Sequence, residues 1–229
     1  MVAMAAPQIR IKDSDRLAFF GSTGSGKTYR ATRMLANHPR VAVIDPKFDL
    51  HLPGAKVVHK YDPKLPRQVF RPYGNTPIYE QTEQYLYDLW RHRLPGVVYA
   101  DEVNDLSRSA RSISPMWNRI TRQGRSLGVC AWAASQRPVD VPSTVFTESQ
   151  HFFVFALAWE NDRQKVESFT TDGIASQVER LGAYECVYYS ARTRQALVLP
   201  RTVATQIIPV ARPEPARPSL FSRWFSQRS

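Results

Sequence analysis

Eight residues near the N-terminus have the types and the spacing that hold a triphosphate. They match the pattern G-x-x-x-x-G-K-[ST] in full, as Gly21, Ser22, Thr23, Gly24, Ser25, Gly26, Lys27 and Thr28. Glycines let the backbone fold closely around phosphate oxygens and turn successive N–H groups toward them. Lys27 can then reach the β- and γ-phosphates, and the hydroxyl of Thr28 can bind Mg²⁺. The pattern therefore predicts a phosphate-binding loop that takes ATP and Mg²⁺.

A pair of carboxylates downstream fits the second half of such a site. Asp101 and Glu102 directly follow the apolar run 96–100. The carboxyl end of a buried strand is where open α/β sheets bind ligands. We expect Asp101 to hold Mg²⁺, directly or through water, and Glu102 to polarise the attacking water. The alternative is an acidic pair that merely begins a loop, and the complete phosphate loop upstream argues against it.

The elements that must position these residues alternate between strands and helices. Short apolar runs predict strands at 17–20, 40–44, 57–58, 69–70, 96–100, 129–134 and 152–157. Helical spacing predicts helices over 27–37, 79–93 and 160–169, and a further helix is expected from Ser114 as N-cap with Pro115 in its first turn. Segments 183–189 and 196–199 suggest a hairpin. Alternation of this kind predicts an α/β fold with a mostly parallel central sheet and helices on both faces.

The two ends of the chain differ from this alternating body. Residues 1–16 are expected to be an irregular, polar start. Residues 200–229 carry five prolines and five arginines against one acid, which predicts an extended C-terminal arm after an ATPase domain at 1–199. Phe221, Trp224 and Phe225 give the arm an apolar face that could dock on a neighbour, a capsid or a lipid surface. A solvated tail is the alternative.

Composition adds a partner class and a location. The chain has 229 residues, a net charge of +11 and a pI near 9.9, which favours a polyanionic partner. The N-terminus lacks the basic and apolar regions of a signal peptide, and the longest apolar run, 152–159, is too short to span a bilayer. We therefore expect a cytoplasmic protein, in keeping with two cysteines that are predicted to be buried free thiols.

Further segments resemble the FtsK/HerA superfamily of ring-forming, DNA-translocating ATPases. Asp45-Pro46-Lys47 is similar to the D-P-K of that superfamily, and Asp101-Glu102 is similar to its Walker B segment. The run Ser135-Gln136-Arg137-Pro138 at the end of a strand is the more specific signal, because few other P-loop proteins carry it. The resemblance covers about residues 15–160 and implies a RecA-like (ASCE) P-loop NTPase fold.

The resemblance also implies roles for residues outside the phosphate loop. Gln136 would sense the γ-phosphate from the strand beside Asp101, unless it only caps its own loop. Arg125 would act as an arginine finger on the ATP bound to the neighbouring subunit, and Arg122, one turn earlier, could share or take that role. The alternative for both arginines is a solvated helix face.

The partners implied are double-stranded DNA and further copies of the chain in a homo-oligomeric ring, expected to be a hexamer. A bare ATPase core of this size resembles the genome-packaging ATPases of tailless, membrane-containing icosahedral viruses. Association with a capsid vertex, with viral membrane proteins or with the virion follows from that resemblance. Arg108 and Arg111, in a small polar loop after the Walker B strand, could contact DNA phosphates in a ring channel, or the loop could be an ordinary exposed one.

Other functions stay open at this point. The chain could be another FtsK/HerA-type pump for plasmid or chromosome transfer, or a phage assembly or export protein switched by ATP. A small-molecule kinase could carry a similar phosphate loop but would not need Ser-Gln-Arg-Pro or a basic tail. A GTPase is disfavoured, because the N-K-x-D guanine motif is absent from the sequence.

Overall fold

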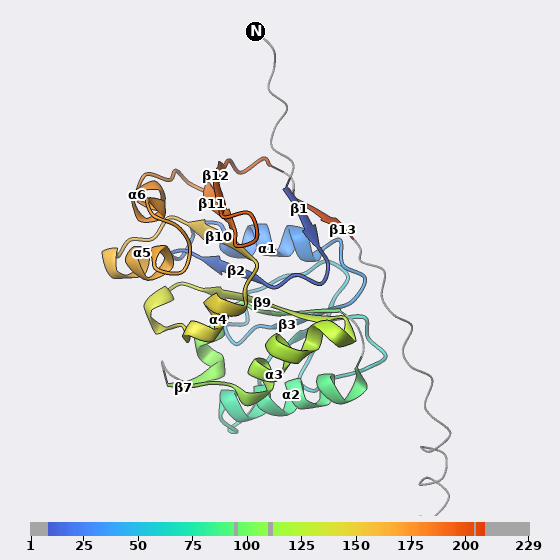
Figure 1. The fold of residues 1–229 in the computed structure, drawn as a ribbon. Helices are drawn as coiled ribbons and strands as arrows, with labels where there is room; N and C mark the ends of the chain where they lie inside the picture. The colour runs from blue at the N-terminus through green and yellow to red at the C-terminus, as the bar shows by residue number, and fades with distance from the viewer. Residues whose placement is uncertain (1–8, 94–95, 110–111, 204, 209–229) are drawn as a thin grey trace, which may run out of the picture.

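The centre of the protein is a nine-stranded sheet with the order β12-β11-β10-β2-β9-β6-β3-β5-β4 (Figure 1). The computed structural model describes residues 9–93, 96–109, 112–203 and 205–208. Seven adjacent strands are parallel, namely β10 (His151–Phe155), β2 (Leu17–Phe20), β9 (Val129–Ser135), β6 (Gly96–Ala100), β3 (Val41–Ile44), β5 (Arg67–Phe70) and β4 (Lys56–Val58). β11 (Cys186–Ser190) and β12 (Gln195–Leu199) add the expected antiparallel hairpin at one edge. The mostly parallel sheet predicted from the sequence is confirmed.

Helices cover both faces of this sheet. Helix α1 (Lys27–Leu35) lies on one face, and α2 (Ile78–His92) and α3 (Pro115–Gln123) lie on the other (Figure 1). The shorter helices α4 (Ser143–Glu148), α5 (Glu160–Glu167) and α6 (Ile174–Glu179) contribute to the same apolar core as α2 and α3. Three 3₁₀ turns, Val103–Leu106, Gly124–Leu127 and Pro138–Asp140, connect elements near the strand ends. None of the helices in the described ranges combines the length and the apolarity needed to cross a membrane.

The central strands are buried on both faces, which explains their uninterrupted apolar sequences. On β2, Phe19 packs in the core under α1, and Phe20 packs in the core under α2 to α6. The Phe19 ring stacks on Phe153 of β10 with 5.1 Å between centroids, and Phe20 stacks on Phe146 of α4 at 4.8 Å. Successive side chains of a strand point to opposite faces, so one four-residue strand anchors both cores.

The start of α3 agrees with the sequence expectation in detail. The Ser114 side chain accepts a hydrogen bond of 2.9 Å from the backbone N–H of Trp117, and Pro115 is the first helical residue. Proline fits there because its missing N–H would have no partner in the helix. The cap fixes the helix whose buried face carries Trp117 and Ile120 against the sheet.

Both ends of the described chain differ from expectation. The predicted irregular start contains β1 (Ile9–Lys12), which pairs in parallel with β13 (Thr205–Ile208), within the predicted arm. The guanidinium of Arg30 on α1 donates to the carbonyls of Pro200 and Val203, both at 3.0 Å. Residues 200–203 and β13, within the predicted arm, are thus packed on the rest of the described chain. Residues 209–229, with the aromatic cluster, lie outside the described residues.

Further short elements were not predicted. Helices α4 and α6 are only six residues long each, too short to show helical periodicity. The segment after the Walker B strand forms a small antiparallel ladder of β7 (Ser107–Ser109) and β8 (Ser112–Ile113). The polar loop expected there is thus at least partly extended and paired.

Candidate nucleotide site

The phosphate loop joins β2 to α1 and needs its glycines. Gly24 and Gly26 have φ angles of 75° and 111°, a region that residues with side chains rarely adopt. A Cβ at Gly26 would lie 2.9 Å from the ring of Tyr184, and one at Gly21 would lie 2.6 Å from the Cβ of Phe155. At Gly21 and Gly26 the loop backbone is therefore packed too closely against neighbouring side chains to carry a Cβ.

Lys27 lies inside this loop at the first position of α1. Only 6% of its surface is exposed, and its Nζ donates to the carbonyl oxygens of Gly21 at 2.6 Å and Ser22 at 3.1 Å. Burial lowers the pKa of Lys27 to about 8, although the nearby carboxylates of Glu102 and Asp101 act in the opposite direction. A buried ammonium that is short of negative charge is suited to an anionic ligand such as a triphosphate.

Thr28 and Asp101 meet beside the lysine. The Thr28 hydroxyl donates to Oδ1 of Asp101 at 2.9 Å, and the Tyr99 hydroxyl donates to the same oxygen at 2.7 Å. Burial raises the pKa of Tyr99 well above its ordinary value, so the phenol stays a proton donor. A hydroxyl and a carboxylate are the oxygen ligands that Mg²⁺ prefers, and the donor set fits that ion.

Glu102 lies next to Asp101 and is held by two partners. Its Oε2 forms a salt bridge of 3.1 Å with Nζ of Lys47 and accepts a hydrogen bond of 3.3 Å from the backbone N–H of Gln136. Its Oε1 is buried and has no hydrogen-bond partner among the described residues. An unsatisfied carboxylate oxygen in a buried position is suited to accept a proton from a bound water.

The D-P-K segment is divided between two tasks. Asp45 is fully buried and binds Arg71 at 2.9 Å and the backbone N–H of Leu50 at 3.2 Å, so it fixes the loop after β3. Burial raises the pKa of this carboxyl despite its arginine partner. Lys47 instead reaches Glu102. The sequence indicated this segment only through the resemblance, and the contact between Lys47 and Glu102 was not foreseen.

Gln136 lies beside the phosphate loop. Its Oε1 accepts a hydrogen bond of 2.7 Å from the hydroxyl of Thr23. The preceding residue, Ser135, ends β9 and accepts a backbone hydrogen bond of 3.3 Å from Gly21. Because β9 lies between β2 and β6, Gln136 stands between the loop and the acidic pair.

The two candidate arginine fingers lie away from the loop of their own chain. Arg125 belongs to the turn Gly124–Leu127, which precedes β9, whereas the site is at the carboxyl end of that strand. Seven residues of strand separate the two ends by about 20 Å. Arg122 is exposed and forms a wide ion pair of 4.0 Å with Glu148. Neither guanidinium can therefore serve the site of its own chain.

The candidate DNA contacts are less completely described. The backbone of Arg108 belongs to β7, the strand that follows the 3₁₀ turn after Glu102. Arg111 lies outside the described residues. The structure therefore attaches the candidate contact loop directly to the Walker B segment but does not place either guanidinium.

An aromatic cluster beside the loop was missed by the sequence reasoning. The rings of Tyr29 and Tyr184 pack edge to face at 5.8 Å, and the Arg201 guanidinium lies 5.1 Å and 4.7 Å from their centroids. Tyr29 directly follows Thr28 in sequence, which was the available signal. Tyr184 and Arg201 come from distant segments and could not have been assigned from sequence spacing.

Comparisons with known proteins agree with this geometry. No protein-family model matches the chain. Protein P9 of Pseudoalteromonas phage PM2 is 24% identical over 181 residues, which cover 74% of this chain and 82% of that protein. The DNA packaging ATPase P9 of Enterobacteria phage PRD1 is 26% identical over 209 residues, which cover 82% and 87% of the two chains.

A solved structure decides the fold. The genome packaging NTPase B204 of Sulfolobus turreted icosahedral virus 2, in complex with AMP, superposes with a TM-score of 0.69 at 15% identity. The match covers 83% of this chain and 100% of B204. The chain has the RecA-like P-loop fold. The phosphate loop, the Walker B pair and Ser-Gln-Arg-Pro predicted a resemblance to FtsK/HerA-type packaging ATPases. The two P9 proteins and B204 confirm that resemblance.

Proposed function

We propose that this chain is the ATPase of a motor that packages DNA into a viral capsid. The observation that carries the proposal is the convergence of Lys27, Asp101, Glu102 and Gln136 at the carboxyl ends of β2, β6 and β9. Similarity to packaging ATPases along most of the chain supports DNA as the partner.

The site residues divide the work of ATP hydrolysis. Lys27 and the loop N–H groups would bind the β- and γ-phosphates, while Thr28 and Asp101 would hold Mg²⁺. The ion neutralises charge that develops on the phosphate oxygens. Glu102, with its unsatisfied Oε1, would accept a proton from the attacking water, and Gln136 would contact the γ-phosphate from above the loop.

The assembly we propose is a ring in which Arg125 serves the neighbouring subunit, and from the resemblance we take the ring to be a hexamer. Support comes from the position of Arg125 just before the amino end of β9, whereas the site of its own chain lies at the carboxyl end of that strand. Subunits carrying Arg125→Ala, mixed with subunits carrying Lys27→Ala, should recover activity at mixed interfaces. Failure to recover activity in any mixture, together with greater damage by Arg122→Ala, would move the role to Arg122.

DNA stimulation of ATP hydrolysis tests the whole proposal. Double-stranded DNA should accelerate phosphate release by the wild type but not by Lys27→Ala. Lys56→Ala, which replaces an exposed lysine on β4, is the control and should respond to DNA like the wild type. Phosphoryl transfer to a nucleoside monophosphate without any response to DNA would favour a kinase instead. If Arg108 and Arg111 both contact phosphates, replacing them by alanine should flatten the log–log salt dependence of DNA binding by about two units.

A further inference from the structure

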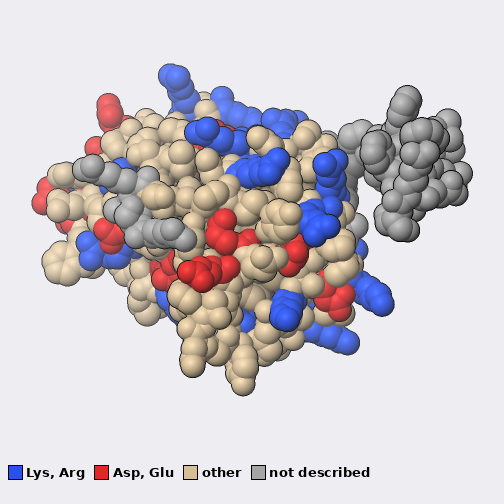
Figure 2. Space-filling model, turned by 90° about the horizontal axis from the view of Figure 1, so that it is seen from below, with Lys and Arg blue, Asp and Glu red and all other residues tan. Residues whose placement is uncertain are grey.

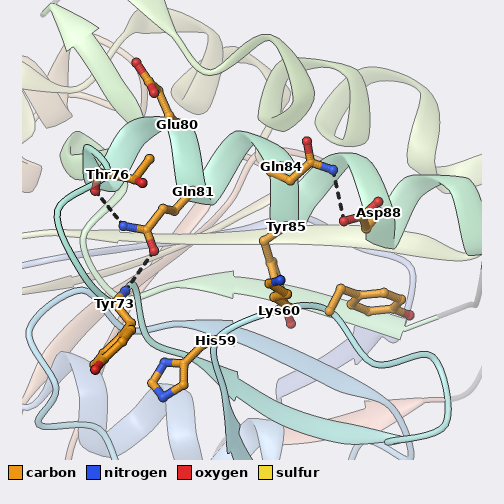
Figure 3. A pocket seen from close by; sticks show the side chains of 10 residues that line it. His59, Lys60, Tyr73, Thr76, Glu80, Gln81, Gln84, Tyr85 and Asp88 are labelled. Atoms are coloured by element: carbon orange, nitrogen blue, oxygen red, sulfur yellow. Dashed lines mark hydrogen bonds between the residues drawn. The ribbon is translucent and has the colours of Figure 1, made fainter.

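A groove of about 510 Å³ lies far from the phosphate loop, between α2 and the segments that follow β4 and β5. Figure 3 shows His59, Lys60 and Tyr73 on one side of it and Tyr85 and Asp88 of α2 on the other, with Glu80 projecting from the helix away from His59 and Tyr73. The wall is held in place by Gln81 of α2, which accepts from the backbone N–H of Tyr73 at 2.8 Å and donates to the carbonyl of Thr76 at 2.6 Å. The groove is therefore a built feature of the sheet edge and shares no residue with the nucleotide site.

One side chain in the groove lacks a partner that its chemistry requires. Tyr85 is 99% buried, and its ring stacks on Phe70 with 4.4 Å between centroids. Tyr85 is one of the residues that line the groove, and its buried hydroxyl has no hydrogen-bond partner among the described residues. A buried hydroxyl without a partner is unfavourable, so a ligand that supplies an acceptor such as a peptide carbonyl would be favoured.

The groove also combines aromatic surface with negative charge. Tyr73 is 75% exposed and its ring packs 5.2 Å from that of His59. Glu80 and Asp88 line the groove together with Lys60, and neither carboxylate forms a salt bridge with another described residue. A second hollow of about 520 Å³ on the other side of α2 shares Glu80 and adds Glu83. Figure 2 shows acidic side chains gathered near the middle of the face that carries α2.

The best match in charge and chemistry is a segment of the same chain. Residues 209–229 carry four arginines against one glutamate, together with Phe221, Trp224 and Phe225. Arginine forms strong hydrogen bonds with carboxylates and stacks on aromatic rings, while the aromatic residues can cover Tyr73 and His59. On a chain with a net charge of +11, a groove that carries two carboxylates against one lysine, beside aromatic rings, complements such a segment.

The length of the segment allows this contact. Twelve residues separate Ile208, the last residue of β13, from Phe221. Extended, they span about 40 Å, whereas a globular domain of this size has a radius of gyration of about 17 Å. The segment can therefore reach the groove of its own chain or that of an adjacent copy.

We propose that the groove beside α2 binds the arginine- and aromatic-rich segment 217–229 of this chain. Arginines of the segment pair with Glu80 and Asp88, its aromatic side chains cover Tyr73 and His59, and a backbone carbonyl accepts the hydrogen bond of the Tyr85 hydroxyl. The contact links the C-terminus to a surface outside the catalytic site, so it does not depend on the proposed function.

Cysteine crosslinking of the full-length chain tests this contact. The two native cysteines are buried, so a variant with Gln84→Cys and Ser226→Cys has one reactive thiol in the groove and one in the segment. A short bis-maleimide should join them at least tenfold faster than in the matched control with Gln164→Cys and Ser226→Cys, since Gln164 is exposed on α5. A crosslinked monomer indicates docking within one chain, and a crosslinked dimer indicates docking between copies. Equal rates in the two variants would overturn the proposal.

Further substitutions, added to the Gln84→Cys and Ser226→Cys variant, test whether the groove recognises the segment or only lies near it. Glu80→Gln with Asp88→Asn should slow the crosslink at least fivefold, whereas Glu160→Gln with Asp172→Asn, an equal change of charge elsewhere, should leave it unchanged. Tyr85→Phe removes only the hydroxyl and should slow it severalfold while the protein unfolds at an unchanged temperature. If the groove substitutions have no more effect than the control pair, the segment is not recognised there.

Discussion

Replacing Lys27 by methionine should stabilise the nucleotide-free protein at neutral pH and abolish its stabilisation by ATP. The two effects have opposite signs because the lysine is buried among loop carbonyls, where its charge is unfavourable until phosphates arrive. Methionine has a similar length and carries no charge. It therefore fills the loop without the desolvation cost.

The structure sets the size of the effect. The pKa of Lys27 falls from its ordinary value of 10.5 to about 8. At about 1.4 kcal/mol per unit of pKa shift, the buried charge lowers the free energy of unfolding at neutral pH by about 3 kcal/mol. Losing the two hydrogen bonds to Gly21 and Ser22 costs about 1 kcal/mol each. The net gain is about 1 kcal/mol, or about 2–4 °C in unfolding temperature for a protein of this size.

The sign should reverse at high pH. Between pH 8 and 10.5 the unfolded chain keeps the Lys27 proton that the folded protein has released, so the stability of the wild type rises with pH relative to that of Lys27→Met. Near pH 10 the wild type should therefore be the more stable of the two. Below pH 8 the difference should be constant.

Urea unfolding with and without ATP and Mg²⁺, at pH 7 and pH 10, measures all of these quantities. Lys56→Met, which removes an exposed lysine on β4, is the matched control and should follow the wild type. If Lys27→Met is the less stable protein at both pH values, the buried ammonium does not destabilise the loop and the reasoning is refuted.

Three other substitutions test separate parts of the molecule. Glu102→Gln should bind ATP with nearly unchanged affinity but release phosphate far more slowly, because only activation of water is lost; wild-type turnover would remove Glu102 from that role. Tyr29→Ala should weaken binding of ATP more than binding of inorganic triphosphate in competition assays, if the ring contacts the base; equal losses would place the base elsewhere. Arg30→Met should lower the free energy of unfolding in urea by about 2 kcal/mol, because the buried guanidinium bonds two carbonyls; an unchanged midpoint would show that the contact is not stabilising.

The parts of the site that could be predicted from the sequence are those fixed by local spacing. The phosphate loop runs from the end of one strand into the next helix, and the acidic pair directly follows another strand, so their placement required only the alternation of strands and helices. Gln136 was singled out only through the resemblance; it accepts a hydrogen bond from Thr23 of the loop, and its role as a γ-phosphate sensor stays a prediction. The order of adjacent parallel strands then brings the three segments together.

The parts that could not be predicted depend on contacts between distant segments. The salt bridge of Lys47 with Glu102 joins residues from the ends of two neighbouring strands, and no spacing rule identifies it. The packing of Tyr184 on Gly26 requires the hairpin edge to fold back over the loop. Strand β13 was hidden because its sequence adjoins a proline- and arginine-rich stretch whose composition suggested an unpacked arm.

The pairing of β1 with β13 also sets the time at which the fold can close during synthesis. Ile9 pairs with Thr205, so these partners are separated by 205 − 9 = 196 residues of chain. At translation rates of about 5–20 residues per second, the first strand waits roughly 10–40 s for its partner. Until then Ile9 and Ile11, both buried in the finished protein, lack part of their cover and leave a strand edge open to other chains. A nascent chain is thus exposed to mispairing for most of its synthesis, and a product that stops before residue 205 cannot form this ladder.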